Sequence, residues 1–229
     1  MGIAQRYESV RAQVDACCRS CGRDPREVTL VAVSKTVGVE GVEQAFSAGA
    51  REFGENRPDQ IVLKSGAFPT ASWHFIGNIQ SRRIGDIVSS ASLIHSLHQM
   101  SHAEKIDATA QRLGIVQDVL LEVNVSGEES KSGLEPVDAL DFARACAALP
   151  AVRVRGLMTM APRGDRVVAS EVFDDLADLS RSIRADLPSC DAAFFNELSM
   201  GMSEDWEEGI RAGASIVRIG RAIFSDSFE

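Results

Sequence analysis

Apolar and polar residues along the chain follow two alternating patterns. An amphipathic helix is predicted for 2–20, where apolar side chains recur at helical spacing (Ile3, Tyr7, Val10, Val14, Cys17). The next run, 28–36, is instead mainly apolar and rich in β-branched residues until it reaches Lys35, and it is bounded by Pro25 and Gly38. Such a run predicts a buried strand.

The same change of pattern repeats to the end of the chain. Further strands are predicted at 51–56, 73–77, 93–97, 116–125, 152–160, 194–201 and 215–220. Helices are predicted between them at 39–48, 57–66, 81–89, 101–113, 136–149, 167–187 and 203–212. Eight strands, each but the last followed by a helix, predict a single (β/α)8 TIM barrel over residues 1–229, with an extra N-terminal helix. An open doubly wound sheet is the alternative, but no Gly-x-Gly-x-x-Gly turn follows the first strand.

Composition narrows the class of protein. The chain of 229 residues is 45% hydrophobic and 25% charged, which is ordinary for a soluble globular protein. Its net charge of −9 argues against a nucleic-acid surface and against an anionic membrane as partner. There is no signal peptide pattern and no apolar run of about twenty residues, so we expect a cytoplasmic protein.

Cysteine and histidine spacing indicates no metal site. Cys17, Cys18 and Cys21 resemble half a zinc site, but no second Cys or His pair lies at finger or ribbon spacing. Packing on a helix face explains them more simply. His95 and His98, with His102 beyond them, lack a carboxylate or cysteine at ligand spacing and are interpreted as solvated or capping residues.

Lys35 lies at the end of the first predicted strand. Two interpretations fit a lysine there. Burial would make the amine reactive toward a carbonyl compound, with which it would form a Schiff base. Alternatively, the side chain would extend from the strand end to water.

Chemistry in a TIM barrel lies at the carboxyl ends of the strands. The segments expected there are Lys35, Glu55-Asn56, 74–78, 124–131, 158–160, 199–203 and 218–221. The loops after strands seven and eight are the usual phosphate site of this fold. We therefore predict a phosphate cradle from Ser199-Met200-Gly201-Met202-Ser203, with Ser203 as a helix N-cap, and from Gly220-Arg221; plain strand-to-helix turns are the alternative.

Three further side chains have open roles. Arg218 is either an inward donor to a ligand's ring nitrogen or anion, or an outward ion-pair partner. His74 is either a site residue or a satisfied core histidine. Lys131 is either a solvated loop charge or a second amine near the ligand.

Seven motifs, in order along nearly the whole chain, resemble the pyridoxal 5′-phosphate (PLP) homeostasis protein family. They are Ala32-Val33-Ser34-Lys35-Thr36, Phe53-Gly54-Glu55-Asn56, Trp73-His74-Phe75-Ile76-Gly77 with Gln80-Ser81, Ser130-Lys131-Ser132-Gly133, Arg155-Gly156-Leu157-Met158, Leu198-Ser199-Met200-Gly201-Met202-Ser203 and Val217-Arg218-Ile219-Gly220.

The resemblance implies a fold-type III PLP barrel, similar to the N-terminal domain of alanine racemase. It implies that Lys35 forms the internal aldimine and that Ser199 to Ser203 and Gly220-Arg221 hold the phosphate. Arg218 would face the pyridine nitrogen and keep it unprotonated, which weakens the ring as an electron sink. Asn56, His74 and Met158 would line the ring.

The resemblance also implies a function in PLP (vitamin B6) homeostasis and in amino- and keto-acid pools, without established catalysis. PLP-dependent apoenzymes are possible partners, and a monomer is expected. Two residues depart from the family's pattern: Arg57 replaces an aromatic residue and Arg221 a small one. A racemase of this type uses a tyrosine as its second base, but the one tyrosine here, Tyr7, precedes the first strand. The alternatives are a PLP-dependent racemase or lyase, and a Schiff-base aldolase that uses Lys35 without a cofactor.

Overall fold

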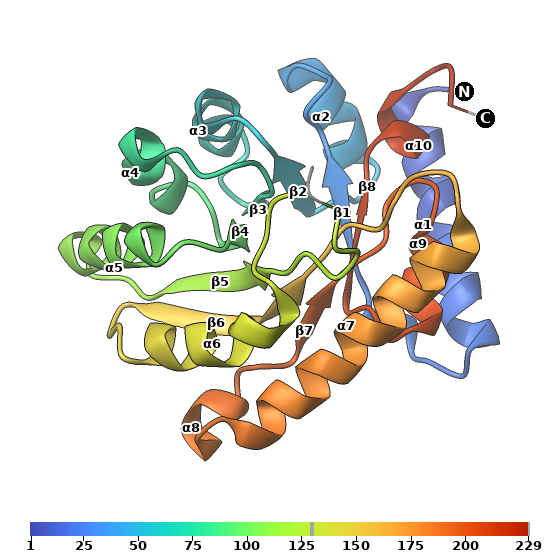
Figure 1. Cartoon of the computed structure of the whole chain (residues 1–229). Coiled ribbons are helices and arrows are strands. Elements are labelled where there is room, and N and C mark those ends of the chain that lie inside the picture. The colour runs from blue at the N-terminus through green and yellow to red at the C-terminus, as the bar shows by residue number, and fades with distance from the viewer. Residues whose placement is uncertain (129–130, 229) are drawn as a thin grey trace.

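Eight parallel strands form a closed barrel in the computed structural model, which describes residues 1–128 and 131–228 (Figure 1). The strands are β1 Thr29–Val33, β2 Glu52–Glu55, β3 Ser72–Phe75, β4 Leu93–Leu97, β5 Gln117–Glu122, β6 Val152–Met158, β7 Glu197–Ser199 and β8 Ile216–Ile219. They are hydrogen-bonded in chain order, and β8 pairs with β1 to close the ring. The predicted (β/α)8 barrel is confirmed.

Helices surround the barrel because each connection between parallel neighbours must cross back along the outside. They are α1 Ile3–Ser20, α2 Val39–Ser47, α3 Pro58–Ala67, α4 Ile84–Val88, α5 Met100–Leu113, α6 Ala139–Ala147, α7 Arg166–Asp186, α8 Ser189–Ala192, α9 Trp206–Arg211 and α10 Arg221–Phe224. Short 3₁₀ turns occupy Pro25–Glu27, Ser81–Arg83 and Pro136–Asp138. The extra helix α1 packs against α2, α9 and α10, next to the C-terminal end of the chain (Figure 1).

Side chains of alternate strand residues divide the core in two. Outward-facing residues pack under the helices as one large apolar cluster. Inside the barrel lies a much smaller apolar cluster, formed by Val31, Val33, Leu93, Leu120, Met158 and Ile216. Much of the remaining interior is therefore available to polar side chains.

Two element boundaries near the C-terminus differ from the predictions. The seventh strand begins at Glu197, not at 194, because the amides of Phe194 and Phe195 donate to the Asp191 carbonyl at the end of α8. The following helix begins at Trp206 and its N-cap is Asp205, so the prediction of Ser203 as N-cap is wrong. Residues 202–205 instead form a turn in which the Met202 amide donates to Asp205 Oδ1 at 2.6 Å.

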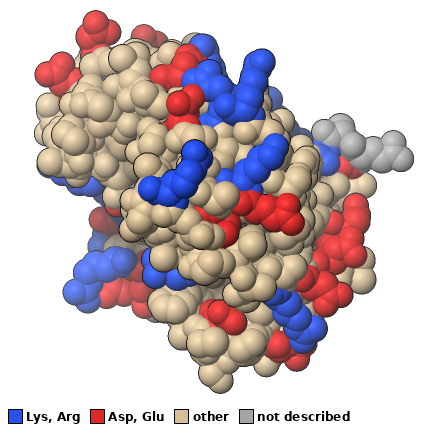
Figure 2. Space-filling model, turned by 90° about the vertical axis from the view of Figure 1, so that its left-hand side faces the viewer, with Lys and Arg blue, Asp and Glu red and all other residues tan. Residues whose placement is uncertain are grey.

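Charged residues of both signs are interspersed on the face formed by α3, α4 and α5 (Figure 2). That face carries no continuous basic tract of the kind that nucleic acid binding requires. Among the described helices, none is long and apolar enough to cross a bilayer.

Candidate functional site

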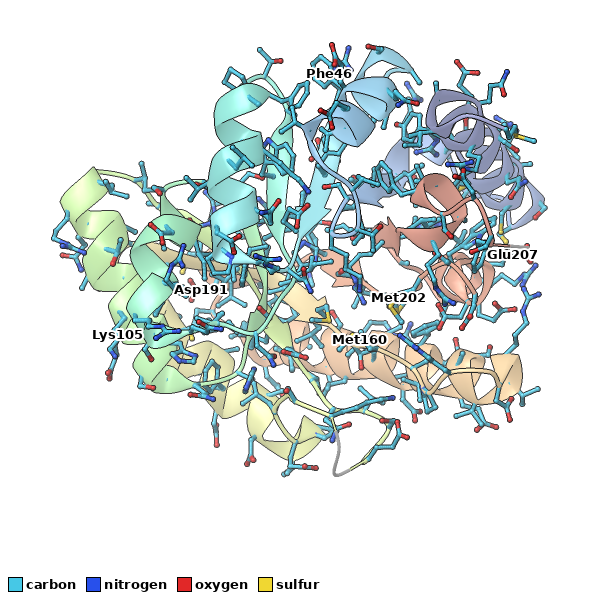
Figure 3. All side chains as sticks on the ribbon, turned by 90° about the horizontal axis from the view of Figure 1, so that it is seen from above. Phe46, Lys105, Met160, Asp191, Met202 and Glu207 are labelled. Carbon is cyan, nitrogen blue, oxygen red and sulfur yellow. The ribbon has the colours of Figure 1, made fainter. Side chains whose placement is uncertain are left out.

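A cavity of about 250 Å³ opens at the carboxyl ends of the strands. This volume is slightly below the roughly 300–1,000 Å³ of drug-sized ligand sites, which suits a small ligand. Met160 and Met202 lie close together at this end of the barrel in Figure 3, and both line the cavity. The predicted residues that line it are Lys35, Asn56, Met158, Met202, Ser203, Arg218, Gly220 and Arg221.

Lys35 lies two residues beyond β1, which ends at Val33. Ser34 is fully buried, but Lys35 is exposed at the cavity wall. Of the two interpretations of Lys35, the exposed side chain is therefore the one observed, because the chain turns outward before the lysine. Among the described residues no carboxylate pairs with Lys35, and its amine is available to a ligand in the cavity.

Arg218 projects into the barrel from β8 and is 4% exposed. Its Nη1 donates to Ser199 Oγ, and its Nη2 donates to the Thr159 carbonyl at 2.9 Å. Burial lowers the pKa of Arg218 to about 10, so the guanidinium is still charged at neutral pH. Of the two open roles, the inward one is therefore the one observed: a rigidly held donor group at the base of the cavity.

Two loops meet at the edge of the cavity between β7 and β8. Ser203 Oγ, in the loop after β7, accepts a long hydrogen bond of 3.4 Å from the Ala222 amide in the first turn after β8. In the described part of the chain, the amides of Ser203, Gly220 and Arg221 have no acceptor. Unpaired amides of this kind form an anion site when they point to one place.

Glycine is required at one position in the cavity wall and at a second position in the loop after β7. A Cβ on Gly77 would lie 2.1 Å from the Asn56 carbonyl oxygen. The chain after β3 can therefore pass this close to Asn56 only because residue 77 is glycine. Gly201 has a φ of +95°, and a Cβ there would lie 2.8 Å from Trp206 Cα. Only glycine therefore allows the loop after β7 to fold against the start of α9.

Four predicted site residues do not line the cavity. His74 lies lower in the barrel, where it contacts His95 and Glu52; it is the satisfied core histidine of the two alternatives. Ser199 is fully buried beneath Arg218. Met200 packs in the outer core, and Gly201 is buried behind the loop.

Lys131 forms an ion pair with Glu128, and its amine also donates to the Met160 carbonyl at 3.1 Å. It does not line the cavity, so the loop-charge interpretation describes it best. Ser130, in the same motif, lies outside the described residues. Arg57 pairs with Asp59 away from the cavity, whereas Arg221 reaches Glu204 at its rim, with 2.7 Å between the charged atoms.

Several residues in and behind the wall were not predicted. Arg163, Glu204 and Asp205 line the cavity, and burial raises the pKa of Asp205. The position of Arg163 just after the predicted strand end at Met160 is the signal that could have indicated it. The fully buried lysine of this protein is Lys64 on α3, which pairs with the equally buried Glu55. An amphipathic pattern gives no sign of such a pair.

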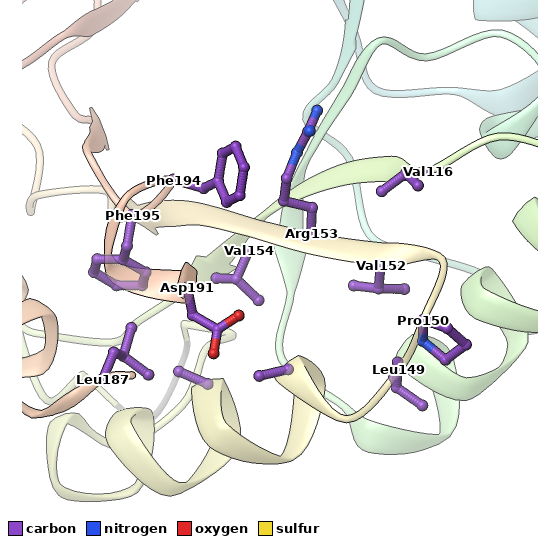
Figure 4. A pocket seen from close by; sticks show the side chains of 12 residues that line it. Val116, Leu149, Pro150, Val152, Arg153, Val154, Leu187, Asp191, Phe194 and Phe195 are labelled. Atoms are coloured by element: carbon purple, nitrogen blue, oxygen red, sulfur yellow. The ribbon is translucent and has the colours of Figure 1, made fainter. Parts of the chain in front are cut away.

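A second cavity, of about 320 Å³, lies at the opposite end of the barrel (Figure 4). It is lined mainly by apolar residues of β6, α6 and the segment before β7, and its Arg153 is held by Asp118 at 2.6 Å. This end of a TIM barrel serves stability rather than chemistry. The described residues hold no cluster of three His, Cys, Asp or Glu side chains suited to a metal ion.

Comparison with known proteins agrees with this geometry. Residues 7–227 match the alanine racemase N-terminal domain family. The pyridoxal phosphate homeostasis protein of Aquifex aeolicus is 35% identical over 99% of both chains. The chain belongs to the pyridoxal phosphate homeostasis protein family.

Solved structures of similar chains share the whole barrel. A protein of unknown function from Bifidobacterium adolescentis superposes with a TM-score of 0.90 at 34% identity, covering 97% of this chain and 94% of the other. PipY of Synechococcus elongatus, solved with PLP bound, gives a TM-score of 0.84 at 30% identity, covering 97% of this chain and all of PipY. A barrel of this shape that is 30% identical to this chain has therefore been solved with PLP bound.

Proposed function

We propose that this homeostasis-family protein binds PLP in the cavity at the carboxyl ends of the strands, as a Schiff base on Lys35. The observation that carries the proposal is one cavity with three kinds of group: an exposed amine, a buried guanidinium and two loops with unpaired amides. PLP carries one matching group for each, namely an aldehyde, a pyridine nitrogen and a phosphate. The PLP bound to PipY supports PLP as the ligand.

Formation of the Schiff base would be a condensation that releases one water molecule. The Lys35 amine would condense with the aldehyde, so that a C=N bond forms and the aldehyde oxygen leaves as water. Ser203, Gly220 and Arg221 would hold the phosphate through their amides, with the exposed Arg163 adding positive charge at the rim. Asn56 and Met158 would contact the ring.

Arg218 would donate a hydrogen bond to the pyridine nitrogen. A guanidinium remains protonated in proteins, so it leaves that nitrogen unprotonated. An unprotonated ring withdraws electrons weakly, which suits a protein that holds PLP without transforming amino acids. Tyr7 is buried in α1 among outer-core residues, and no tyrosine lines the cavity.

We infer a role in PLP and amino- and keto-acid homeostasis rather than catalysis. In this proposal residues 1–229 form one PLP-binding domain, which acts in the cytoplasm as a monomer and exchanges PLP with PLP-dependent apoenzymes.

Titration with PLP, followed by absorption spectroscopy, tests this function. The wild type should develop a visible Schiff-base band, Lys35→Ala should not, and Lys105→Ala, at an exposed lysine outside the cavity, should behave like the wild type. No band in the wild type would refute PLP binding and favour an aldolase. Turnover of an amino acid faster than by free PLP, lost in Lys35→Ala, would instead establish a racemase or lyase.

A further inference from the structure

Five polar side chains form a continuous hydrogen-bonded line through the barrel interior. Glu52 Oε2, at the start of β2, lies 2.9 Å from His74 Nε2 on β3. His74 Nδ1 lies 2.8 Å from His95 Nε2 on β4, and His95 Nδ1 lies 2.9 Å from Ser199 Oγ on β7. Ser199 Oγ in turn accepts from Arg218. The line therefore connects the amino-terminal end of the barrel with the base of the cofactor cavity.

The chemistry of the two ends determines where every proton in the line lies. Arg218 has only donors, so it donates to Ser199 Oγ. Within the described residues, the one acceptor for the Ser199 hydroxyl hydrogen is His95 Nδ1, and an unpaired buried hydroxyl would be costly. His95 must then carry its proton on Nε2 and donate to His74 Nδ1. His74 likewise carries its proton on Nε2 and donates to the Glu52 carboxylate, which only accepts.

Burial and charge agree with this proton arrangement. His95 is fully buried, and this burial, reinforced by the charge of Arg218, lowers the pKa of His95 well below its ordinary value, so its ring is neutral. The hydrogen bond from His74 lowers the pKa of Glu52, which keeps the carboxylate ionised. An anion at one end and a cation at the other are thus joined by three neutral groups.

We propose that Glu52, His74 and His95 are positioning residues that act through Ser199 on Arg218. The Glu52 carboxylate holds the proton of each histidine on Nε2, and this leaves Ser199 as a fixed acceptor for the guanidinium. Ser199 Oγ and the Thr159 carbonyl together orient Arg218, so that its remaining N–H groups face the cavity. The effect of this positioning on PLP binding rests on the proposed function. The proton positions themselves do not depend on PLP.

Nuclear magnetic resonance of the cofactor-free protein, with ¹⁵N in its histidines, tests the line directly, because protonated and bare ring nitrogens differ widely in chemical shift. In the wild type, His74 and His95 should both be neutral with protonated Nε2 and bare Nδ1. Glu52→Met removes the acceptor without adding a donor. Because the Ser199 hydroxyl still needs His95 Nδ1 as its acceptor, this variant alone should leave both rings protonated on Nε2. Adding Ser199→Ala frees the other end of the line as well, and the His95 proton is then expected to populate Nδ1.

Glu197→Met is the matched control. Glu197 is the first residue of β7, as Glu52 is of β2, but its carboxylate contacts Ser215 and Arg155. Its replacement should leave both histidine spectra unchanged. Ser199→Ala cuts the line at the opposite end and should also leave His95 protonated on Nε2. This variant provides the test if Glu52→Met does not fold.

The outcomes separate this inference from PLP binding. A protonated Nδ1 on His95 in the wild type or in either single variant, or an unchanged His95 in the folded double variant Glu52→Met with Ser199→Ala, would overturn the proton line. If PLP binds, Glu52→Met should bind it about tenfold more weakly than Glu197→Met, the effect of disturbing one charged hydrogen bond. A protein with the expected proton positions that never takes up PLP would refute the proposed function and support the line alone.

Discussion

Lys64 on α3 and Glu55 at the end of β2 form a buried ion pair behind the cavity. Lys64 Nζ also donates to the Ser34 carbonyl at 3.0 Å, and the Ser34 hydroxyl donates to Glu55 Oε1 at 2.7 Å. The pair therefore holds the backbone immediately before Lys35. A fully buried lysine thus supports the exposed lysine that we assign to the cofactor.

Lys64→Met tests the energy of this pair. It would leave the Glu55 carboxylate buried without its partner, and we expect the free energy of unfolding to fall by roughly 3–5 kcal/mol. Equilibrium urea unfolding measures the change. The double variant Lys64→Met with Glu55→Met should recover most of the loss, and Lys105→Met at the surface should cost little. A Lys64→Met protein as stable as Lys105→Met would show that the pair contributes nothing.

Gly201→Ala tests the packing of the loop after β7, with Gly213→Ala as its matched control. Both glycines have a positive φ, +95° and +105°, but a Cβ on Gly213 has no atom within 4 Å. We expect Gly213→Ala to lose about 1–2 kcal/mol of unfolding free energy from backbone strain. Gly201→Ala should lose about 1–3 kcal/mol more from its contact with Trp206.

The PLP affinity of the same two variants gives a second readout. Gly201→Ala should bind PLP more weakly because its loop carries the Ser203 amide, whereas Gly213→Ala should match the wild type. Equal stability and equal PLP affinity for the two variants would contradict the described loop.

Two histidines three residues apart should change stability in opposite directions with pH. Burial lowers the pKa of His95, so below about pH 6.5 only the unfolded chain gains its proton and stability falls as pH falls. The Glu122 carboxylate, 3.3 Å from the His98 ring, raises the pKa of His98. Its contribution is fully present below about pH 6.5 and is lost as pH rises through the raised pKa.

Urea midpoints of the wild type, His95→Gln and His98→Gln, measured from pH 5 to 8, check both signs. The stability difference between wild type and His95→Gln should shrink toward acid pH. The difference for His98→Gln should shrink toward alkaline pH. Parallel curves for all three proteins would refute both assignments.

The barrel fold, and the set of residues at the carboxyl ends of its strands, could be predicted because both depend on the local pattern of apolar and polar residues. Strand and helix periods set the eightfold alternation, and strand polarity then placed Asn56, Met158 and Arg218 at one end. How deep a side chain lies inside the barrel does not follow from the local sequence pattern. His74 lies near a strand end, yet its side chain points to Glu52 and not into the cavity. The burial of Lys64 depends on a partner nine residues earlier in sequence and on a different element, which no periodicity encodes.

Borohydride reduction of the PLP-treated protein, followed by peptide mass mapping, tests the central assignment most directly. The chain has four lysines, and reduction converts a Schiff base into a stable pyridoxyl adduct at the lysine that formed it. We predict the adduct on Lys35 and none on the buried Lys64 or on Lys105. An adduct confined to Lys131 or to the N-terminal amine, or no adduct at all, would contradict the assignment of Lys35.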